Sequence, residues 1–212
     1  MKSVLISIQP NWCELIANGK KTMEVRKSAP KIKAPFKCYI YCTSVKSMTL
    51  NEYVEVHRKT GGAVDDWNGK VIGEFLCDGI ITVDCDSVAP FDPETHEYIQ
   101  VETCLDRASF VRYTNFKKAV GWYISDLKIY EKPRELSEFW VYNEELHKRY
   151  DSERDFCCYD ATNEYGEALT DCGEACNNIL NCYRCWNEWS GWCHHVNRPP
   201  QSWCYVEELQ NV

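Results

Sequence analysis

Two cations and a carboxylate stand close together near the start of this 212-residue chain. Lys21, Glu24 and Arg26 belong to the segment Gly19-Lys20-Lys21-Thr22-Met23-Glu24-Val25-Arg26, which reads G-x-K-x-x-E-x-R. A lysine can hold a phosphate or polarise a carbonyl, a carboxylate can act as a general base, and an arginine can grip a phosphate through two donors. Two interpretations remain open from these residues alone: a solvated strand face, or a site for an anionic ligand.

A helix followed by a strand would position these groups. Residues 18–19, Asn-Gly, form a helix-stop signal. Residues 22–26 alternate polar and apolar side chains, a pattern typical of a half-buried strand. We therefore expect Glu24 and Arg26 on one face of a strand, with Lys21 at its start. Charges fixed on a rigid strand must pair with one another or with a ligand, because an unpaired buried charge is costly.

The segment around these charges resembles the signature of the ASCH domain (activating signal cointegrator homology), a small β-barrel of the PUA-like superfamily. Four other segments look like parts of the same family. They are residues 3–10 as its first strand, 11–18 as its first helix, 69–75 as its central barrel strand and 198–205 as its closing P-P-Q-S segment. The resemblance implies an α+β fold in which helices flank a small barrel.

The resemblance also implies a cleft beside the signature strand that binds RNA or a modified nucleoside or nucleotide. Lys20 and Lys21 would contact the ligand, and Glu24 and Arg26 would contact it or shape the pocket as an ion pair. Two prolines precede Gln201 and Ser202 and fix the loop that carries them. The predicted ligand-binding residues are Lys20, Lys21, Glu24, Arg26, Gln201 and Ser202.

An enzymatic interpretation is the alternative. Some small bacterial proteins similar to this one are amidohydrolases that remove the acetyl group from acetylated cytidine, and other ASCH proteins are ribonucleases or plain nucleic-acid binders. This chain keeps the family's lysine as Lys21, but Glu24 replaces its threonine, and Glu102 lies roughly where a distant glutamate would fall. Lys21 and Glu24 are the predicted catalytic residues of this alternative. Because Glu24 replaces a hydroxyl, the leading interpretation is binding.

Cysteines crowd into a late segment of the chain. Eight of the 14 cysteines lie between residues 157 and 204, and the spacings C-x-x-x-C and C-x-x-C resemble a zinc ribbon or knuckle. We expect a structural zinc ion; free thiols packed beside tryptophans and disulfides are the competing interpretations. The segment could also dock a protein partner. The predicted zinc ligands are Cys172, Cys176, Cys182 and Cys185, with Cys193 or His194 as alternates.

The charge of the chain is unevenly distributed. The net charge is −8, yet residues 1–59 hold eleven Lys and Arg against four Asp and Glu. A basic face on an acidic body suggests a local site for an anion and disfavours a broad nucleic-acid binder. The cations expected on this face are Lys20, Lys21, Arg26, Lys27, Lys31, Lys33 and Lys37.

The composition predicts a soluble protein. Hydrophobic residues make up 44% and charged residues 26%, and no apolar run approaches the roughly 18 residues that span a bilayer. The apolar stretch at the N-terminus is too short for a signal peptide, so we expect a cytoplasmic location. The other six cysteines are expected to be small core residues: Cys13, Cys38, Cys42, Cys77, Cys85 and Cys104.

The pattern of elements completes the expectation. Strands are predicted at residues 3–8, 22–26, 36–42, 70–85 with a bend at Gly79, 121–130 and 203–206; helices are predicted at residues 11–18, 49–60 and 105–120; and a turn is predicted at residues 65–69. Apolar periodicity fades from residue 141 onward and returns near residue 197. We therefore expect an ASCH/PUA-like barrel formed by residues 1–140 and 197–212, and a Cys- and Trp-rich insertion at residues 141–196.

Overall fold

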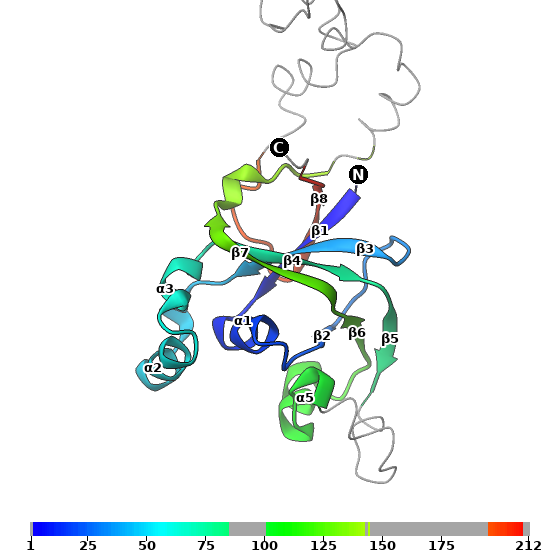
Figure 1. Cartoon of the computed structure of the whole chain (residues 1–212). Helices are drawn as coiled ribbons and strands as arrows, with labels where there is room; N and C mark the ends of the chain where they lie inside the picture. The colour runs from blue at the N-terminus through cyan, green and yellow to red at the C-terminus, as the bar shows by residue number, and fades with distance from the viewer. Residues whose placement is uncertain (1, 85–100, 143, 145–194, 210–212) are drawn as a thin grey trace, which may run out of the picture.

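The computed structural model describes residues 2–84, 101–142, 144 and 195–209, and the chain folds there as a mixed α+β protein (Figure 1). In chain order the elements are β1 (Lys2–Ile8), α1 (Pro10–Ala17), β2 (Met23–Arg26), β3 (Phe36–Cys42), the 3-10 helix η1 (Val45–Ser47), α2 (Leu50–Lys59), α3 (Ala63–Trp67), β4 (Val71–Cys77), β5 (Ile80–Val83), α5 (Arg107–Thr114), β6 (Ala119–Tyr123), β7 (Ser125–Arg134), η2 (Leu136–Glu138) and β8 (Trp203–Glu207).

The strands form two sheets. Five strands pair in the order β7-β4-β3-β1-β8, with β1 and β3 parallel and the other neighbours antiparallel. Three strands pair antiparallel in the order β2-β6-β5. Two short connections carry the chain directly from one sheet to the other, at residues 78–79 between β4 and β5 and at Ile124 between β6 and β7. The predicted bend at Gly79 therefore separates two strands.

The predicted barrel is not closed in the described part of the chain. The bent β4–β5 and β6–β7 pairs join the sheets on one side. On the other side, where β2 would have to meet β1 or β8, the described residues show no strand pairing. The connection there is a side-chain hydrogen bond of 2.6 Å, which Arg26 Nη2 donates to the carbonyl oxygen of Ser7. A buried charged side chain thus bridges the seam, and the two sheets are separate ladders there.

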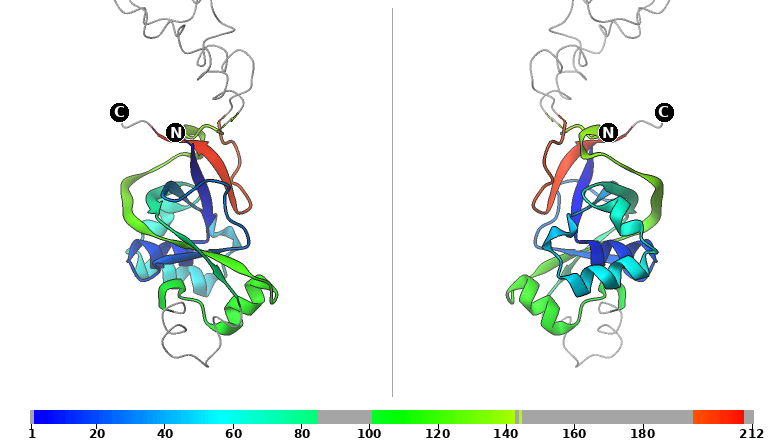
Figure 2. Two further views of the ribbon diagram at one scale, coloured as in Figure 1. Left: turned by 90° about the vertical axis from the view of Figure 1, so that its right-hand side faces the viewer. Right: turned by 90° about the vertical axis from the view of Figure 1, so that its left-hand side faces the viewer.

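Apolar side chains hold the sheets and helices together. Trp122 of β6 is fully buried, and its ring packs edge-on against Phe36 of β3, with 5.8 Å between the ring centroids. Phe110 of α5 packs with Met23 and Val25 of β2, which fixes α5 against the three-stranded sheet. Figure 2 shows α5 at the end of the molecule remote from the start of β1. In this arrangement α5 stands beside β2.

The cysteines predicted for the core are largely confirmed. Cys13, Cys38, Cys42 and Cys77 are fully buried free thiols. Burial raises the pKa of the Cys13 and Cys38 thiols well above the ordinary value, which keeps both inert. Cys104 is partly exposed, so the prediction is wrong there, and Cys85 lies outside the described residues.

Two predicted boundaries and one predicted burial pattern are wrong. The turn at residues 65–69 is largely helix α3, whose start Gly62 makes possible with a φ of 90°. Helix α5 ends at Thr114 and not at residue 120, because Asn115 adopts a left-handed φ of 52°. Strand β2 is buried on both faces and not half-buried, because α5 and the segment before β8 cover its polar face.

The predicted insertion lies mainly outside the described residues. Residues at and beside its two ends pair with one another: Trp140 and His195 form an antiparallel bridge, and the Val196 amide donates a 2.7 Å hydrogen bond to the Phe139 carbonyl oxygen. Val141 bridges Val206 of β8. None of the helices in the described segments has both the length and the apolar composition needed to cross a membrane.

Candidate functional site

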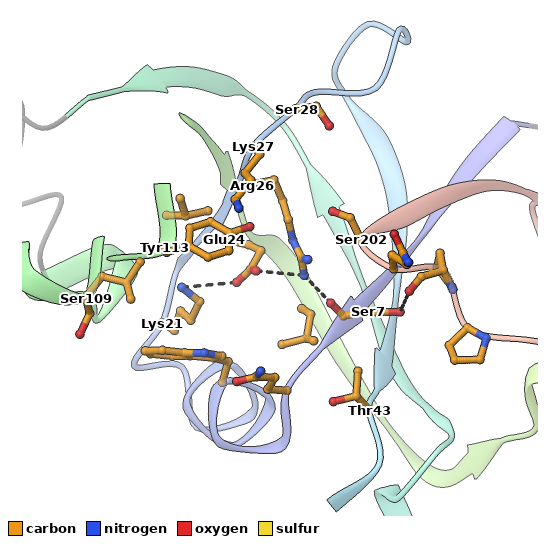
Figure 3. Close-up of a pocket in the computed structure, with 18 of the residues that line it drawn as sticks. Ser7, Lys21, Glu24, Arg26, Lys27, Ser28, Thr43, Ser109, Tyr113 and Ser202 are labelled. Carbon is orange, nitrogen blue, oxygen red and sulfur yellow. Dashed lines mark hydrogen bonds and ion pairs between the residues drawn. The ribbon is translucent and has the colours of Figure 1, made fainter. Parts of the chain in front are cut away.

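A pocket of about 1010 Å³ opens at the seam between the two sheets (Figure 3). Its walls come from β2, the end of β1, the start of α1, helix α5 and the segment before β8. The lining residues that carry polar, charged or aromatic groups are Ser7, Gln9, Trp12, Lys21, Glu24, Arg26, Lys27, Ser28, Thr43, Ser109, Arg112, Tyr113, Gln201 and Ser202.

The three charges that the sequence singled out form one cluster in this pocket. Lys21 Nζ lies 3.4 Å from Glu24 Oε2, and Arg26 Nη2 lies 3.1 Å from Glu24 Oε1. The three residues are only 3%, 6% and 7% exposed, respectively. One carboxylate thus stands between two cations, and the buried cluster carries one positive charge in excess. We call these residues the Lys21–Glu24–Arg26 cluster.

Backbone carbonyls anchor both cations. Lys21 Nζ donates a 2.7 Å hydrogen bond to the carbonyl oxygen of Thr103, and Arg26 Nη2 donates to that of Ser7. Arg26 Nε and Thr43 Oγ1 are buried, and neither has a hydrogen-bond partner among the described residues. Since buried polar groups are nearly always paired, these two atoms lack a hydrogen bond that such groups normally make.

The turn after α1 separates the two neighbouring lysines. Asn18 caps the helix and Gly19 has a φ of 70°, so the backbone amides of Lys20 and Lys21 both donate to the Leu15 carbonyl oxygen. Lys21 enters the pocket, whereas Lys20 is exposed and is not among the lining residues. The fold therefore brings only one of the two predicted lysines into the cluster.

The register of β2 sends its charges into the pocket. β2 pairs with β6 so that Val25 is opposite Gly121. A side chain at Gly121 would collide with the Met23 thioether, so this glycine allows Met23 to pack closely onto the sheet. With Met23 and Val25 in the core, Glu24 and Arg26 project from the opposite face into the pocket.

Aromatic rings and further cations flank the cluster. Lys21 Nζ lies 5.2 Å from the centroid of the Trp12 ring, and Lys27 Nζ lies 5.1 Å from that of Tyr113. Burial raises the pKa of the Tyr113 phenol, and nearby Arg26 lowers it in part. Tyr113 and Arg112 come from α5, far from the cluster in sequence. Only the basic and aromatic run of residues 112–118 could have drawn attention to them.

The closing segment also reaches the pocket. Gln201 and Ser202 line it, as do Pro199 and Pro200. The Ser7 amide donates a 2.9 Å hydrogen bond to the Ser202 carbonyl oxygen, and the Ser7 hydroxyl donates a 2.7 Å bond to that of Pro200. These bonds to the end of β1 hold the loop over the seam.

Glu102, which lies roughly where the family's distant glutamate would fall, does not line the pocket, and neither does Thr22, the threonine nearest to Glu24 in sequence. Thr22 is exposed, and its backbone amide donates a 2.9 Å hydrogen bond to the Glu102 carbonyl oxygen. The serine and threonine hydroxyls that line the pocket belong to Ser7, Ser28, Thr43, Ser109 and Ser202.

The predicted basic face is divided in the structure. Lys21 and Arg26 are buried in the cluster, and Lys27 stands at the pocket. Lys37 lies on the five-stranded sheet, where its Nζ is 3.0 Å from Glu208 Oε1 and 3.8 Å from Glu74 Oε1. The run of cations along the sequence is therefore not a single surface.

The predicted zinc ligands lie outside the described residues, as does the whole run from Cys172 to His194. Within the described residues, no group of three or more His, Cys, Asp or Glu side chains could hold a metal ion.

Comparisons with known proteins give structural neighbours only. No family model matches the chain, and no curated protein matches it significantly. The solved structure of ASCH from Zymomonas mobilis is 17% identical, with a TM-score of 0.44, over 73% of this chain and 80% of that one. Two single-residue mutants of that protein match at 18% and 17% identity, with TM-scores of 0.44 and 0.43, over 74% and 73% of this chain and 84% and 81% of theirs. These proteins bear the name of the family that the sequence resembles.

Proposed function

We propose that the pocket binds RNA or a modified nucleoside or nucleotide, with an anionic or carbonyl group of the ligand against the Lys21–Glu24–Arg26 cluster. The observation that carries this proposal is the excess positive charge of a cluster whose members are all more than nine-tenths buried. Burying an uncompensated charge is costly, and a bound anion would offset that cost.

The rings in the pocket support a nucleic-acid ligand over a simple anion. Trp12 and Tyr113 line the same pocket as the cluster. Aromatic side chains stack on unpaired bases, while arginine and lysine contact the phosphates. Lys27 and Arg112 extend the positive charge beside the rings. A nucleotide offers both parts that this pocket could recognise, a flat base and an anionic group.

The geometry favours binding over catalysis by Glu24. Each Glu24 oxygen already faces a cation, Lys21 on one side and Arg26 on the other. A general base must present a free oxygen to the proton that it removes. Lys21 and Glu24 are therefore better suited to hold a ligand than to process it. We accordingly infer an ASCH-type binding protein and place the amidohydrolase and ribonuclease alternatives second.

Substitutions in the cluster test the proposal. Lys21→Met and Arg26→Lys are each expected to weaken binding of nucleoside 5′-monophosphates and single-stranded RNA dodecamers about 10- to 100-fold, because each removes a charge-assisted hydrogen bond. Lys37→Met is the matched control, since Lys37 pairs with carboxylates on the other sheet. Titration of tryptophan fluorescence measures affinity, and circular dichroism checks folding. Unchanged affinity in folded cluster variants would refute the binding proposal.

An activity assay on the same preparation separates binding from catalysis. Incubation with acetylated cytidine and with RNA is expected to give neither acetate release nor cleavage. If either product forms with the wild-type protein and is lost in Glu24→Gln, then the enzymatic alternative replaces the binding proposal. The RNA incubation is repeated with added divalent metal.

We further propose, from the cysteine spacing alone, that residues 141–196 form an insertion stabilised by zinc. Cys172, Cys176, Cys182 and Cys185 are the expected ligands, with Cys193 or His194 as alternates. About one zinc ion per reduced chain is expected by elemental analysis, and it should fall in a variant with Cys182 and Cys185 replaced by serine. A metal content well below one per chain in reduced protein would remove this proposal.

A further inference from the structure

The surface beside the pocket on α5 and the turn after it is unusually basic. Residues 107–118, R-A-S-F-V-R-Y-T-N-F-K-K, hold four cations and no carboxylate, although the whole chain has a net charge of −8. Tyr113 is 37% exposed and Phe116 is 74% exposed. We call this surface the α5 face; it consists of Arg112, Tyr113, Phe116, Lys117 and Lys118.

The α5 face is continuous with the pocket. Arg112 and Tyr113 belong to both, and Lys27 of the pocket lies over the Tyr113 ring. Figure 3 shows Tyr113 close to the Lys21–Glu24 pair, on the side where α5 packs against β2. A linear polymer with one unit in the pocket would therefore pass Tyr113 and then contact Phe116 and the two lysines after it.

The backbone conformation that exposes Phe116 is energetically unfavourable in the unbound protein. Asn115 and Phe116 have φ values of 52° and 61°, and a left-handed conformation is unfavourable for a bulky residue such as phenylalanine. The Phe116 ring is nevertheless mostly exposed, so burial of the ring in the described core does not compensate for the strain. A strained turn that exposes an aromatic ring is the kind of feature found where a partner supplies the missing contacts.

The charges of the α5 face are available to an anion. Arg112, Lys117 and Lys118 form no salt bridge with any carboxylate in the described part of the chain. Asp106, the nearest acid in sequence, accepts a 2.6 Å hydrogen bond from the Ser109 amide and caps α5. Alternating cations and exposed rings match the requirements of a single strand, whose phosphates and base faces are both accessible.

We propose that the ligand is a segment of single-stranded RNA longer than one nucleotide. One nucleotide occupies the pocket, and its neighbours cross the α5 face with bases on Tyr113 and Phe116 and phosphates near Lys117 and Lys118. This inference rests on the proposed function, because it extends the same ligand beyond the pocket. It names RNA, and not a free nucleoside or nucleotide, as the substrate class of the site.

The test compares short and long probes on the full chain. Nucleoside 5′-monophosphates probe the pocket alone, and single-stranded RNA dodecamers probe the pocket and the α5 face together. The dodecamer is expected to bind at least about tenfold more tightly, since each stacked base contributes about a factor of 5 to 100. Phe116→Ala should weaken dodecamer binding by a factor in that range and leave monophosphate binding unchanged.

The lysines are tested through salt dependence. Replacing both Lys117 and Lys118 with glutamine should reduce the slope of log affinity against log salt for the dodecamer by about 1.4, which is about 0.7 for each phosphate contact to a single strand. Matched controls are Leu50→Ala, an exposed apolar residue on α2, and glutamine at Lys128 and Lys132, exposed cations on β7. These controls should change neither affinity nor slope.

The outcomes distinguish a failure of the further inference from a failure of the proposed function. If monophosphates bind but the dodecamer binds no more tightly, or if the α5-face variants behave as their controls, the further inference is overturned and the proposed function stands. If neither probe binds the wild-type chain, both fail. Circular dichroism confirms that each variant is folded, which is expected because the replaced side chains are exposed.

Discussion

The Lys21–Glu24–Arg26 cluster and a second charged cluster on the five-stranded sheet combine similar groups in opposite ways. In the first, two buried cations share one carboxylate, and Arg26 Nε has no described partner. In the second, Lys37 lies between Glu74 and Glu208, and the Tyr130 hydroxyl donates a 2.6 Å hydrogen bond to Glu74 Oε2. We call the second group the Lys37 cluster.

The difference shows what marks a binding site in this chain. The Lys37 cluster is partly exposed, with 22% to 27% of its charged side chains accessible, so water can complete its solvation. The Lys21–Glu24–Arg26 cluster lacks that access and lines a pocket. Lys37 has two carboxylates for its single charge, whereas Lys21 and Arg26 share one. The number of cations alone does not separate the two sites, but burial and the unbalanced charge do.

The largest expected effect is the loss of the buried carboxylate. Glu24→Gln leaves Lys21 and Arg26 without a countercharge, and removing one partner of a buried ion pair typically costs about 3 to 5 kcal/mol of folding free energy. Glu74→Gln removes a partly exposed partner and should cost about 1 kcal/mol or less. Urea unfolding of both variants measures the contrast. Equal losses would show that the two clusters do not differ as we argue.

The second effect is stabilisation by ligand. A single-stranded RNA dodecamer present at about 100 times its dissociation constant should raise the unfolding free energy of the wild-type protein by about 2.7 kcal/mol. Arg26→Lys should show less stabilisation at the same concentration, because its site is less occupied. Lys37→Met should be stabilised as much as the wild type. Equal stabilisation of Arg26→Lys would place the ligand away from the cluster.

The third effect contrasts two tyrosines. Tyr113→Leu should weaken binding of single-stranded RNA by about 1 to 3 kcal/mol, the contribution of one stacked base, with little loss of stability. Tyr130→Phe removes the hydrogen bond to Glu74 and should cost about 1 to 3 kcal/mol of stability without changing affinity. Paired binding and urea titrations check both. A loss of affinity in Tyr130→Phe would link the Lys37 cluster to the ligand.

Local patterns predicted much of the fold. The alternation of side chains along residues 36–42 predicted the observed bounds of strand β3, and the isolated Gly79 marked the break between β4 and β5. Helix α2 begins where Thr49 and Glu52 form a capping box. These features depend on neighbours within a few residues. The open seam between β2 and β1 could not be predicted that way, because it depends on where Arg26 meets Ser7 across two sheets.

The candidate site was predictable in its charges and not in its surroundings. Residues 21–26 identified the charges, and Gln201 and Ser202 were expected from the prolines before them. Arg112 and Tyr113 were missed because they reach the pocket only through the packing of Phe110 on β2. Lys37 was grouped with the wrong cations, since its partner Glu208 lies at the other end of the chain. Long-range packing decides which charges share a site.

The smallest expected effect lies in the Lys37 cluster itself. A double-mutant cycle with Lys37→Met and Glu208→Gln should give a coupling of about 0.2 to 1 kcal/mol at neutral pH, as for other accessible ion pairs. Partial burial lowers the pKa of Lys37, but the Glu208 contact and the charges of Tyr39 and Glu74 raise it more, so the net shift is upward from 10.5. A raised lysine pKa means that the contribution is complete below about pH 10.5 and is lost as the pH rises through the folded-state value. Urea unfolding of the four proteins at pH 8 and pH 11.5 should therefore show the coupling at the lower pH and its decline at the higher. A coupling that grew with pH would contradict the assignment of Lys37 as the cation of this structural pair.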